Sequence, residues 1–145
     1  MISVILPSYK EKELQQTIDS LLETAEKEIQ VIAVLDGYWP EEPLKPDPRV
    51  HILHFGKSHG MRAAINAGVA IAKGEYIMKA DAHCLFAPGW DTALLSEIKD
   101  NWVVIPRRYK LDTEKWKVMP DRPTDYDKLI ILTDRNKFHG EEWRG

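Results

Sequence analysis

Short apolar runs alternate with amphipathic segments over residues 2–105, and this alternation limits the fold class more than any other feature. The apolar runs end at Pro, Gly or Asp, as buried strands do, and cover residues 2–6, 29–35, 50–55, 75–80 and 101–105. Apolar side chains recur at helical spacing between them, in residues 11–28, in residues 60–73 and after Pro88-Gly89. This order predicts an α/β fold with a mostly parallel sheet and helices on both faces.

The helical segments each carry an apolar stripe that we expect to face the sheet. These stripes are Leu14, Ile18, Leu21, Leu22 and Ala25; then Met61, Ala64, Ile65, Gly68, Val69 and Ala72; then Trp90, Leu94, Leu95 and Ile98. Prolines throughout residues 39–49 exclude regular structure there and predict a long loop. After Pro106 the pattern weakens, and only residues 129–132 are typical of a further strand.

The composition excludes several classes of protein. A net charge of -3 over 145 residues provides no basic field for nucleic acid. No apolar stretch is long enough to cross a bilayer, and the N-terminal run lacks the charged leader of a signal peptide. The single cysteine, Cys84, excludes an internal disulfide framework, so we expect a cytoplasmic protein. Its thiol is expected to be a small buried group, with a ligand or nucleophile as the alternative.

Asp81-Ala82-His83 is the strongest candidate for a metal-binding motif. The carboxylate and the imidazole follow a predicted strand, and ligands bind beyond the carboxyl ends of strands in α/β sheets. Both side chains can reach one divalent cation and leave coordination positions open for phosphate oxygens. The structural alternatives are a turn cap for Asp81 and a packed, neutral imidazole for His83. Asp36 and Ser8-Tyr9-Lys10 follow two other strands, so the topology predicts that these segments meet at one edge.

The sequence also excludes two common nucleotide-binding motifs. No glycine-rich turn follows the first predicted strand, which argues against a dinucleotide-binding fingerprint. Gly56-Lys57-Ser58 suggests a phosphate-binding loop, but His51 stands where that loop requires its first glycine. We therefore interpret residues 56–58 as a polar turn between a strand and a helix.

Several short motifs follow one another in a fixed order over roughly residues 2–105. They are Pro7-Ser8-Tyr9-Lys10-Glu11 after the first strand, Leu35-Asp36-Gly37 after the second, Gly60 to Gly68 in a helix, Ala72 to Ile77 before Asp81, and Pro88-Gly89-Trp90 after it. In this order the chain resembles the family-2 glycosyltransferases and their GT-A relatives. It departs from the family pattern at Lys10, where Asn is usual, and at Leu35, where the first Asp of Asp-Asp-Gly is usual. Asp81-Ala82-His83 takes the place of Asp-x-Asp, and His followed by Cys is similar to the polypeptide N-acetylgalactosaminyltransferases.

The resemblance implies a GT-A fold, a Rossmann-like three-layer sandwich, with a nucleotide-sugar donor that we expect to be UDP-linked. It also implies a Mn²⁺ or Mg²⁺ ion, held by Asp81 and His83. The residues expected to contact the donor are Pro7, Ser8, Tyr9, Glu11, Asp36, Arg62 and Asp81. Asp36 would accept a hydrogen bond from the base, and Arg62 would reach the base or the diphosphate. Because imidazole is a softer ligand than carboxylate, we expect a preference for Mn²⁺ over Mg²⁺.

The acceptor side is the least defined part of the resemblance. Residues 1–145 are expected to form a single GT-A-like domain, with the donor-binding part in 1–105 and the start of the acceptor part in 106–145. Glu141 and Glu142 are the candidates for the general base that an inverting transferase needs. We expect a domain truncated in its acceptor half, with the acceptor (glycan, lipid or protein) unknown. The alternative to an enzyme is a nucleotide-sugar-binding module without turnover.

Overall fold

The computed structural model describes residues 1–121, 127–131 and 138–142, and it describes side chains for residues 1–121. The chain folds into two compact units, Met1–Asp100 and Asn101–Gly145. No helix among these described residues is long and apolar enough to cross a lipid bilayer.

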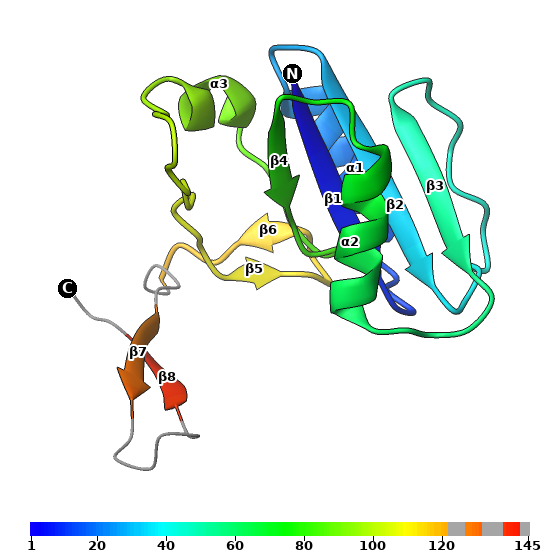
Figure 1. Cartoon of the computed structure of the whole chain (residues 1–145). Helices are drawn as coiled ribbons and strands as arrows, with labels where there is room; N and C mark the ends of the chain where they lie inside the picture. Colours follow the sequence, from blue (N-terminus) through cyan, green and yellow to red (C-terminus); the bar gives the residue numbers. More distant parts are fainter. Residues whose placement is uncertain (122–126, 132–137, 143–145) are drawn as a thin grey trace. The chain divides into compact units, whose positions relative to one another are not determined.

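A parallel sheet forms the centre of the first unit. Its strands are β1 (Ile2–Ser8), β2 (Ile29–Asp36), β3 (Val50–Phe55) and β4 (Tyr76–Lys79), arranged in the order β3-β2-β1-β4 (Figure 1). Each neighbouring pair is parallel, with Ile2 of β1 opposite both Ile29 and Tyr76. The carboxyl ends of the strands therefore lie along one edge of the sheet, as the sequence order predicted.

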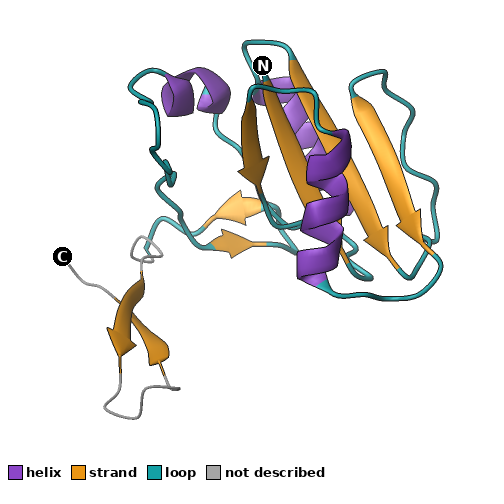
Figure 2. Ribbon diagram, in the orientation of Figure 1, coloured by secondary structure: helices purple, strands orange, loops and turns teal. Residues whose placement is uncertain are grey.

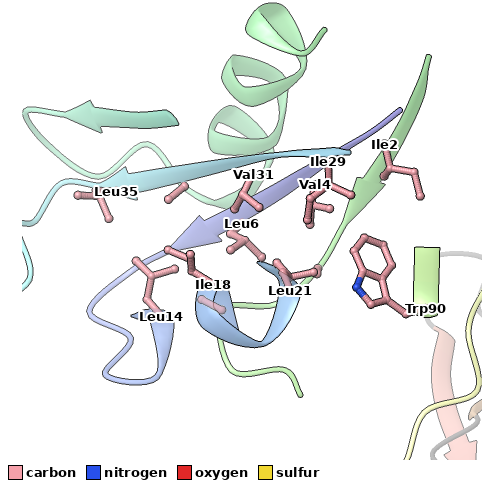
Figure 3. Close-up of a cluster of buried hydrophobic side chains, with 13 residues drawn as sticks. Ile2, Val4, Leu6, Leu14, Ile18, Leu21, Ile29, Val31, Leu35 and Trp90 are labelled. Atoms are coloured by element: carbon pink, nitrogen blue, oxygen red, sulfur yellow. The ribbon is translucent and has the colours of Figure 1, made fainter. Parts of the chain in front are cut away.

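Helices cover both faces of this sheet, which confirms the predicted α/β architecture. They are α1 (Leu14–Thr24), α2 (Met61–Ile71) and the short α3 (Trp90–Leu95) (Figure 2). Figure 3 shows α1 on one face, where Leu14, Ile18 and Leu21 meet Leu6 and Val31, and α2 on the other. Strand β2 is buried along its whole length between these layers, as expected for a mostly apolar central strand.

The packing of α2 differs from the predicted stripe. Ala64 and Gly68 are buried, but Met61 and Val69 are 57% and 43% exposed, so the expectation that both face the sheet was wrong. The contact is narrow because α2 approaches β1 through small residues. A Cβ atom on Gly68 would lie 2.6 Å from Ile5 Cγ2, so only glycine allows this approach. Gly68 thus faces the sheet, as predicted.

The buried carboxylate of Asp91 joins α3 to the turn after α1 by hydrogen bonds. Asp91 is 1% exposed, and its two carboxylate oxygens accept hydrogen bonds from the backbone amides of Glu26 and Lys27, at 3.0 and 2.8 Å. Burial alone would raise the pKa of the Asp91 carboxyl, but the amide donors outweigh it and the pKa is lowered. Helix α3 ends at Leu95, so Ile98 lies beyond it, contrary to the predicted stripe.

The second unit contains short antiparallel pairs. Strands β5 (Leu111–Asp112) and β6 (Lys117–Val118) form one hairpin, and β7 (Asp127–Ile131) pairs with β8 (Phe138–Glu142). The predicted strand at 129–132 corresponds to β7, although residue 132 is outside the described part. The predicted strand at 101–105 was wrong: the segment forms no ladder, and Val103 and Ile105 are 90% and 70% exposed. An apolar run becomes a strand only where a neighbouring strand accepts its hydrogen bonds.

Candidate functional site

Polar side chains alternate with buried alanines in a row that begins at the last residue of β4. Lys79, Asp81 and His83 are exposed, whereas Ala80 and Ala82 between them are 7% and 2% exposed. The backbone amide of Ala80 donates to the carbonyl of Ile5 at 3.1 Å, which continues the ladder with β1 past the end of β4. The small alanines therefore pack inward. Ala82 and His83 form a turn, and Asp81 and His83, on either side of Ala82, are both exposed.

Helix α1 holds this segment in place with buried hydroxyl groups. Thr17 Oγ1 donates to the carbonyl of Ala82 at 2.9 Å and accepts from the amide of Cys84 at 3.0 Å. Ser20 Oγ accepts from the amide of Phe86 at 2.9 Å. Thr17 is fully buried and Ser20 nearly so. The loop that carries Asp81 and His83 is therefore fixed by the protein interior, a role for Thr17 and Ser20 that the apolar helix pattern did not reveal.

Charged neighbours already contact both candidate metal ligands. Lys79 Nζ forms an ion pair with Asp81 Oδ1, and His83 Nδ1 lies 3.4 Å from Glu11 Oε2. Among residues 1–121 and the described parts of β7 and β8, no group of three or more His, Cys, Asp or Glu side chains could hold a metal ion together. Asp81 and His83 are the residues of this segment whose side chains could hold a cation.

The end of β1 carries aromatic and polar groups beside this row. Ser8 Oγ is hydrogen-bonded to the hydroxyl of Tyr38 at 2.5 Å, and the rings of Tyr9 and Tyr38 meet edge to face at 6.4 Å. Tyr9 is 54% exposed, and Lys10 Nζ lies over its ring, 5.3 Å from the centroid. Lys10 adopts a left-handed backbone with φ 58°. Asn tolerates that region better than Lys, which gives a physical reason for the usual Asn at this position.

Asp36, at the end of β2, is hydrogen-bonded to the loop before α2. Its carboxylate accepts hydrogen bonds from Ser58 Oγ at 2.7 Å and from the amides of His59 and Gly60 at 2.7 and 2.9 Å. Burial raises the pKa of this carboxyl, but the hydrogen bonds from His59, Ser58 and Gly60 outweigh it and lower the pKa. Gly37 follows with φ 77°, and a Cβ there would lie 2.3 Å from the nitrogen of Ser58. The polar turn predicted at 56–58 is thus also the partner of Asp36.

The remaining candidates are less constrained. Arg62 is exposed on the first turn of α2, and Pro7 lies half-buried within β1. Trp90 packs in the core as expected, but Trp39 is 66% exposed and stacks on His54 with ring centroids 4.0 Å apart. Glu141 and Glu142 lie on β8 in the second unit, and their side chains fall outside the described part of the structure.

The first unit is therefore a parallel α/β fold in which Ser8, Asp36 and Asp81 lie at or just beyond the carboxyl ends of three strands, the edge where α/β sheets bind ligands. The family model for Glycosyl transferase family 2 matches residues 3–143, and the chain belongs to this family. The family resemblance seen in the sequence motifs is thus confirmed.

Curated relatives support the same assignment. "Glycosyltransferase GlyG" of Streptococcus pneumoniae serotype 4 is 31% identical over 121 residues, covering 77% of this chain and 40% of the relative. "Uncharacterized glycosyltransferase EpsJ" of Bacillus subtilis (strain 168) is 30% identical over 108 residues, covering 70% of this chain and 31% of the relative. The chain therefore spans less than half the length of either protein.

A solved structure shows the same fold. The mannosyltransferase PcManGT from Pyrobaculum calidifontis, determined in complex with GDP-Man and Mn²⁺, aligns with a TM-score of 0.50 and 21% identity. The alignment covers 63% of this chain and 30% of that protein. The predicted GT-A-like fold, with a mostly parallel sheet between helices, is confirmed at this level.

Proposed function

We propose that this chain binds a UDP-linked sugar through a divalent cation and belongs to an enzyme that transfers the sugar to an acceptor hydroxyl or amine. The observation that carries the proposal is the outward pair Asp81 and His83, held at the carboxyl edge of the sheet by buried hydroxyls of α1. Membership of Glycosyl transferase family 2 supports the reaction class. The Mn²⁺ and GDP-Man of the similar mannosyltransferase support the kind of cofactor and donor, though not the base.

The donor atoms of this pair fit a Mn²⁺ ion. One carboxylate and one imidazole provide one oxygen and one nitrogen ligand. This mixed set suits Mn²⁺ better than Mg²⁺, which prefers oxygen ligands alone. Two protein ligands leave most of the coordination shell for diphosphate oxygens and water. A bound cation would offset the negative charge that grows on the diphosphate as the sugar's C–O bond breaks.

The other edge residues can hold the nucleotide. A base could stack on the exposed ring of Tyr9, on a face that Lys10 Nζ leaves open or from which it moves. Asp36 already accepts from Ser58, His59 and Gly60, so about one of its roughly four acceptor positions is left for the base. Pro7, Ser8 and Glu11 would then lie near the nucleoside, with Arg62 at the base or diphosphate.

Calorimetric titration with UDP tests this proposal. We expect binding in Mn²⁺, weaker binding in Mg²⁺ and none with chelator, with GDP bound more weakly than UDP. Asp81→Ala should abolish the metal-dependent binding, and Glu142→Ala, placed on the acceptor side, should spare it. Failure of UDP to bind in Mn²⁺, or equal losses in the two variants, would contradict the proposal.

A second candidate is a donor-binding module without turnover. Hydrolysis of UDP-sugars, followed by release of UDP, distinguishes the two. The likeness of Asp81-Ala82-His83 to polypeptide N-acetylgalactosaminyltransferases is a hypothesis about the donor, and faster hydrolysis of UDP-N-acetylhexosamines than of UDP-hexoses would support it. Glu141 and Glu142 are the proposed acceptor-side bases, and their loss should slow transfer without weakening UDP binding.

A further inference from the structure

The structure brings Glu11 and His83 together from distant parts of the sequence. Glu11 lies between the end of β1 and α1, and His83 follows the neighbouring strand β4. Glu11 Oε2 lies 3.4 Å from His83 Nδ1, with the two side chains 35% and 48% exposed. The motif comparison had placed Glu11 near the nucleoside, so this contact indicates a different partner for its carboxylate.

Both side chains leave from backbone that the fold constrains. On one side, Lys10 turns the chain in a left-handed conformation with φ 58°, directly before Glu11. On the other, Thr17 bonds to the residues that flank His83, through the carbonyl of Ala82 and the amide of Cys84. The backbone that carries His83 is therefore anchored to α1, and Glu11 leaves from a turn directly after β1.

A neutral imidazole has one nitrogen that carries hydrogen and one that can bind a metal ion, and its partner decides which is which. A carboxylate beside Nδ1 favours hydrogen on Nδ1, and this leaves the lone pair on Nε2. Carboxylates that accept from metal-binding imidazoles in this way fix the ring's orientation and make the free nitrogen a better ligand. Glu11 contacts only Nδ1, which leaves Nε2 of His83 available on the side of the ring away from the carboxylate.

We propose that Glu11 is a positioning residue that holds His83 in the tautomer with hydrogen on Nδ1 and so prepares Nε2 to bind the cation beside Asp81. The tautomer itself does not depend on the proposed function, whereas the role toward the cation rests on it. Glu11 acts through His83 and is not a third direct ligand, since no group of three candidate ligands forms among the described residues.

Nitrogen-15 NMR of the metal-free chain tests the tautomer directly. At about pH 8.5, above the range in which imidazole ordinarily takes up a proton, we expect the His83 ring of the wild type to carry hydrogen on Nδ1. Glu11→Ala should shift the ring toward hydrogen on Nε2, and Glu11→Gln, which keeps an acceptor oxygen, should restore much of the original state. Glu13→Ala makes the same change in charge two residues along and should have no effect. A wild-type ring protonated on Nε2, or an unchanged ring in Glu11→Ala, would overturn the proposal.

Titration with Mn²⁺, followed by the loss of its free electron paramagnetic resonance signal, tests the role toward the cation. Glu11→Ala should bind Mn²⁺ about tenfold more weakly, at the low end of the range for such partners because the contact is partly exposed. Glu11→Gln should fall between Glu11→Ala and the wild type, and Glu13→Ala should match the wild type. Equal affinity of Glu11→Ala and the wild type would overturn this role while leaving the metal site itself standing. If the wild type binds no Mn²⁺, the proposed function fails and the role of Glu11 toward the cation fails with it, whatever the tautomer.

Discussion

Thr17→Val should destabilise the first unit and loosen the segment that carries Asp81 and His83. Valine has nearly the same shape as threonine but can neither donate to the carbonyl of Ala82 nor accept from the amide of Cys84, bonds of 2.9 and 3.0 Å. Each hydrogen bond contributes about 1 kcal/mol, and a buried carbonyl left without its donor adds about 1 kcal/mol more. Thr17 and Ala82 are 0% and 2% exposed, so water cannot easily replace the hydroxyl. We expect a loss of about 2–3 kcal/mol in the free energy of unfolding.

Urea unfolding followed by far-ultraviolet circular dichroism measures this loss, because all helices among the described residues lie in the first unit. With an m-value of about 1.5 kcal/mol/M, the midpoint should fall by about 1.3–2 M. Thr24→Val is the matched control on the same helix, since Thr24 Oγ1 donates only to the carbonyl of Ser20, one turn back. That change should cost under about 0.5 kcal/mol. If the two variants lose equal stability, or Thr17→Val binds Mn²⁺ as tightly as the wild type, Thr17 does not hold the segment of Asp81 and His83 in place.

Further predictions concern charge, pH and close packing. Lys79→Met should strengthen Mn²⁺ binding about two- to fivefold, because the ion pair with Asp81 is exposed and competes only weakly for the carboxylate; weaker binding in the calorimeter would contradict this. The pKa of Asp91 is lowered in the folded protein, so its contribution to stability is present above about pH 4 and is lost as pH falls through the folded pKa; Asp91→Asn should be less stable at pH 7 and should show a smaller loss in melting temperature on acidification. Gly74→Ala should cost about 1–3 kcal/mol, because the new Cβ would lie 2.6 Å from a backbone nitrogen of β1. Gly56→Ala, with no atom within 4 Å of its Cβ, should change the melting temperature little.

Much of the first unit could be predicted because its signals are local. The run at 50–55 matches β3 residue for residue, and the strands at the other runs differ from prediction only at their ends. Leu14, Ile18 and Leu21 recur at helical spacing and are buried as expected. Apolar periodicity reports which face of an element is buried, so it works where that element has a partner. The run at 101–105 is also mostly apolar, like the runs that became strands, but it has no neighbouring strand in the described structure. The prediction of a strand failed there.

For the candidate site, too, the sequence predicted one part and only the structure revealed the other. The sequence by itself determined that Asp81, His83 and Asp36 follow parallel strands, and the order of elements placed those ends at one edge. Only the tertiary structure decided what each group contacts: Lys79 pairs with Asp81, Glu11 approaches His83, and the loop at 58–60 occupies most of Asp36. Such contacts join residues far apart in the chain, and their distances depend on how helices and loops pack. A pattern of residue types does not report that packing. The hydrogen bonds from Thr17 and Ser20 of α1 could therefore be found only in the folded protein.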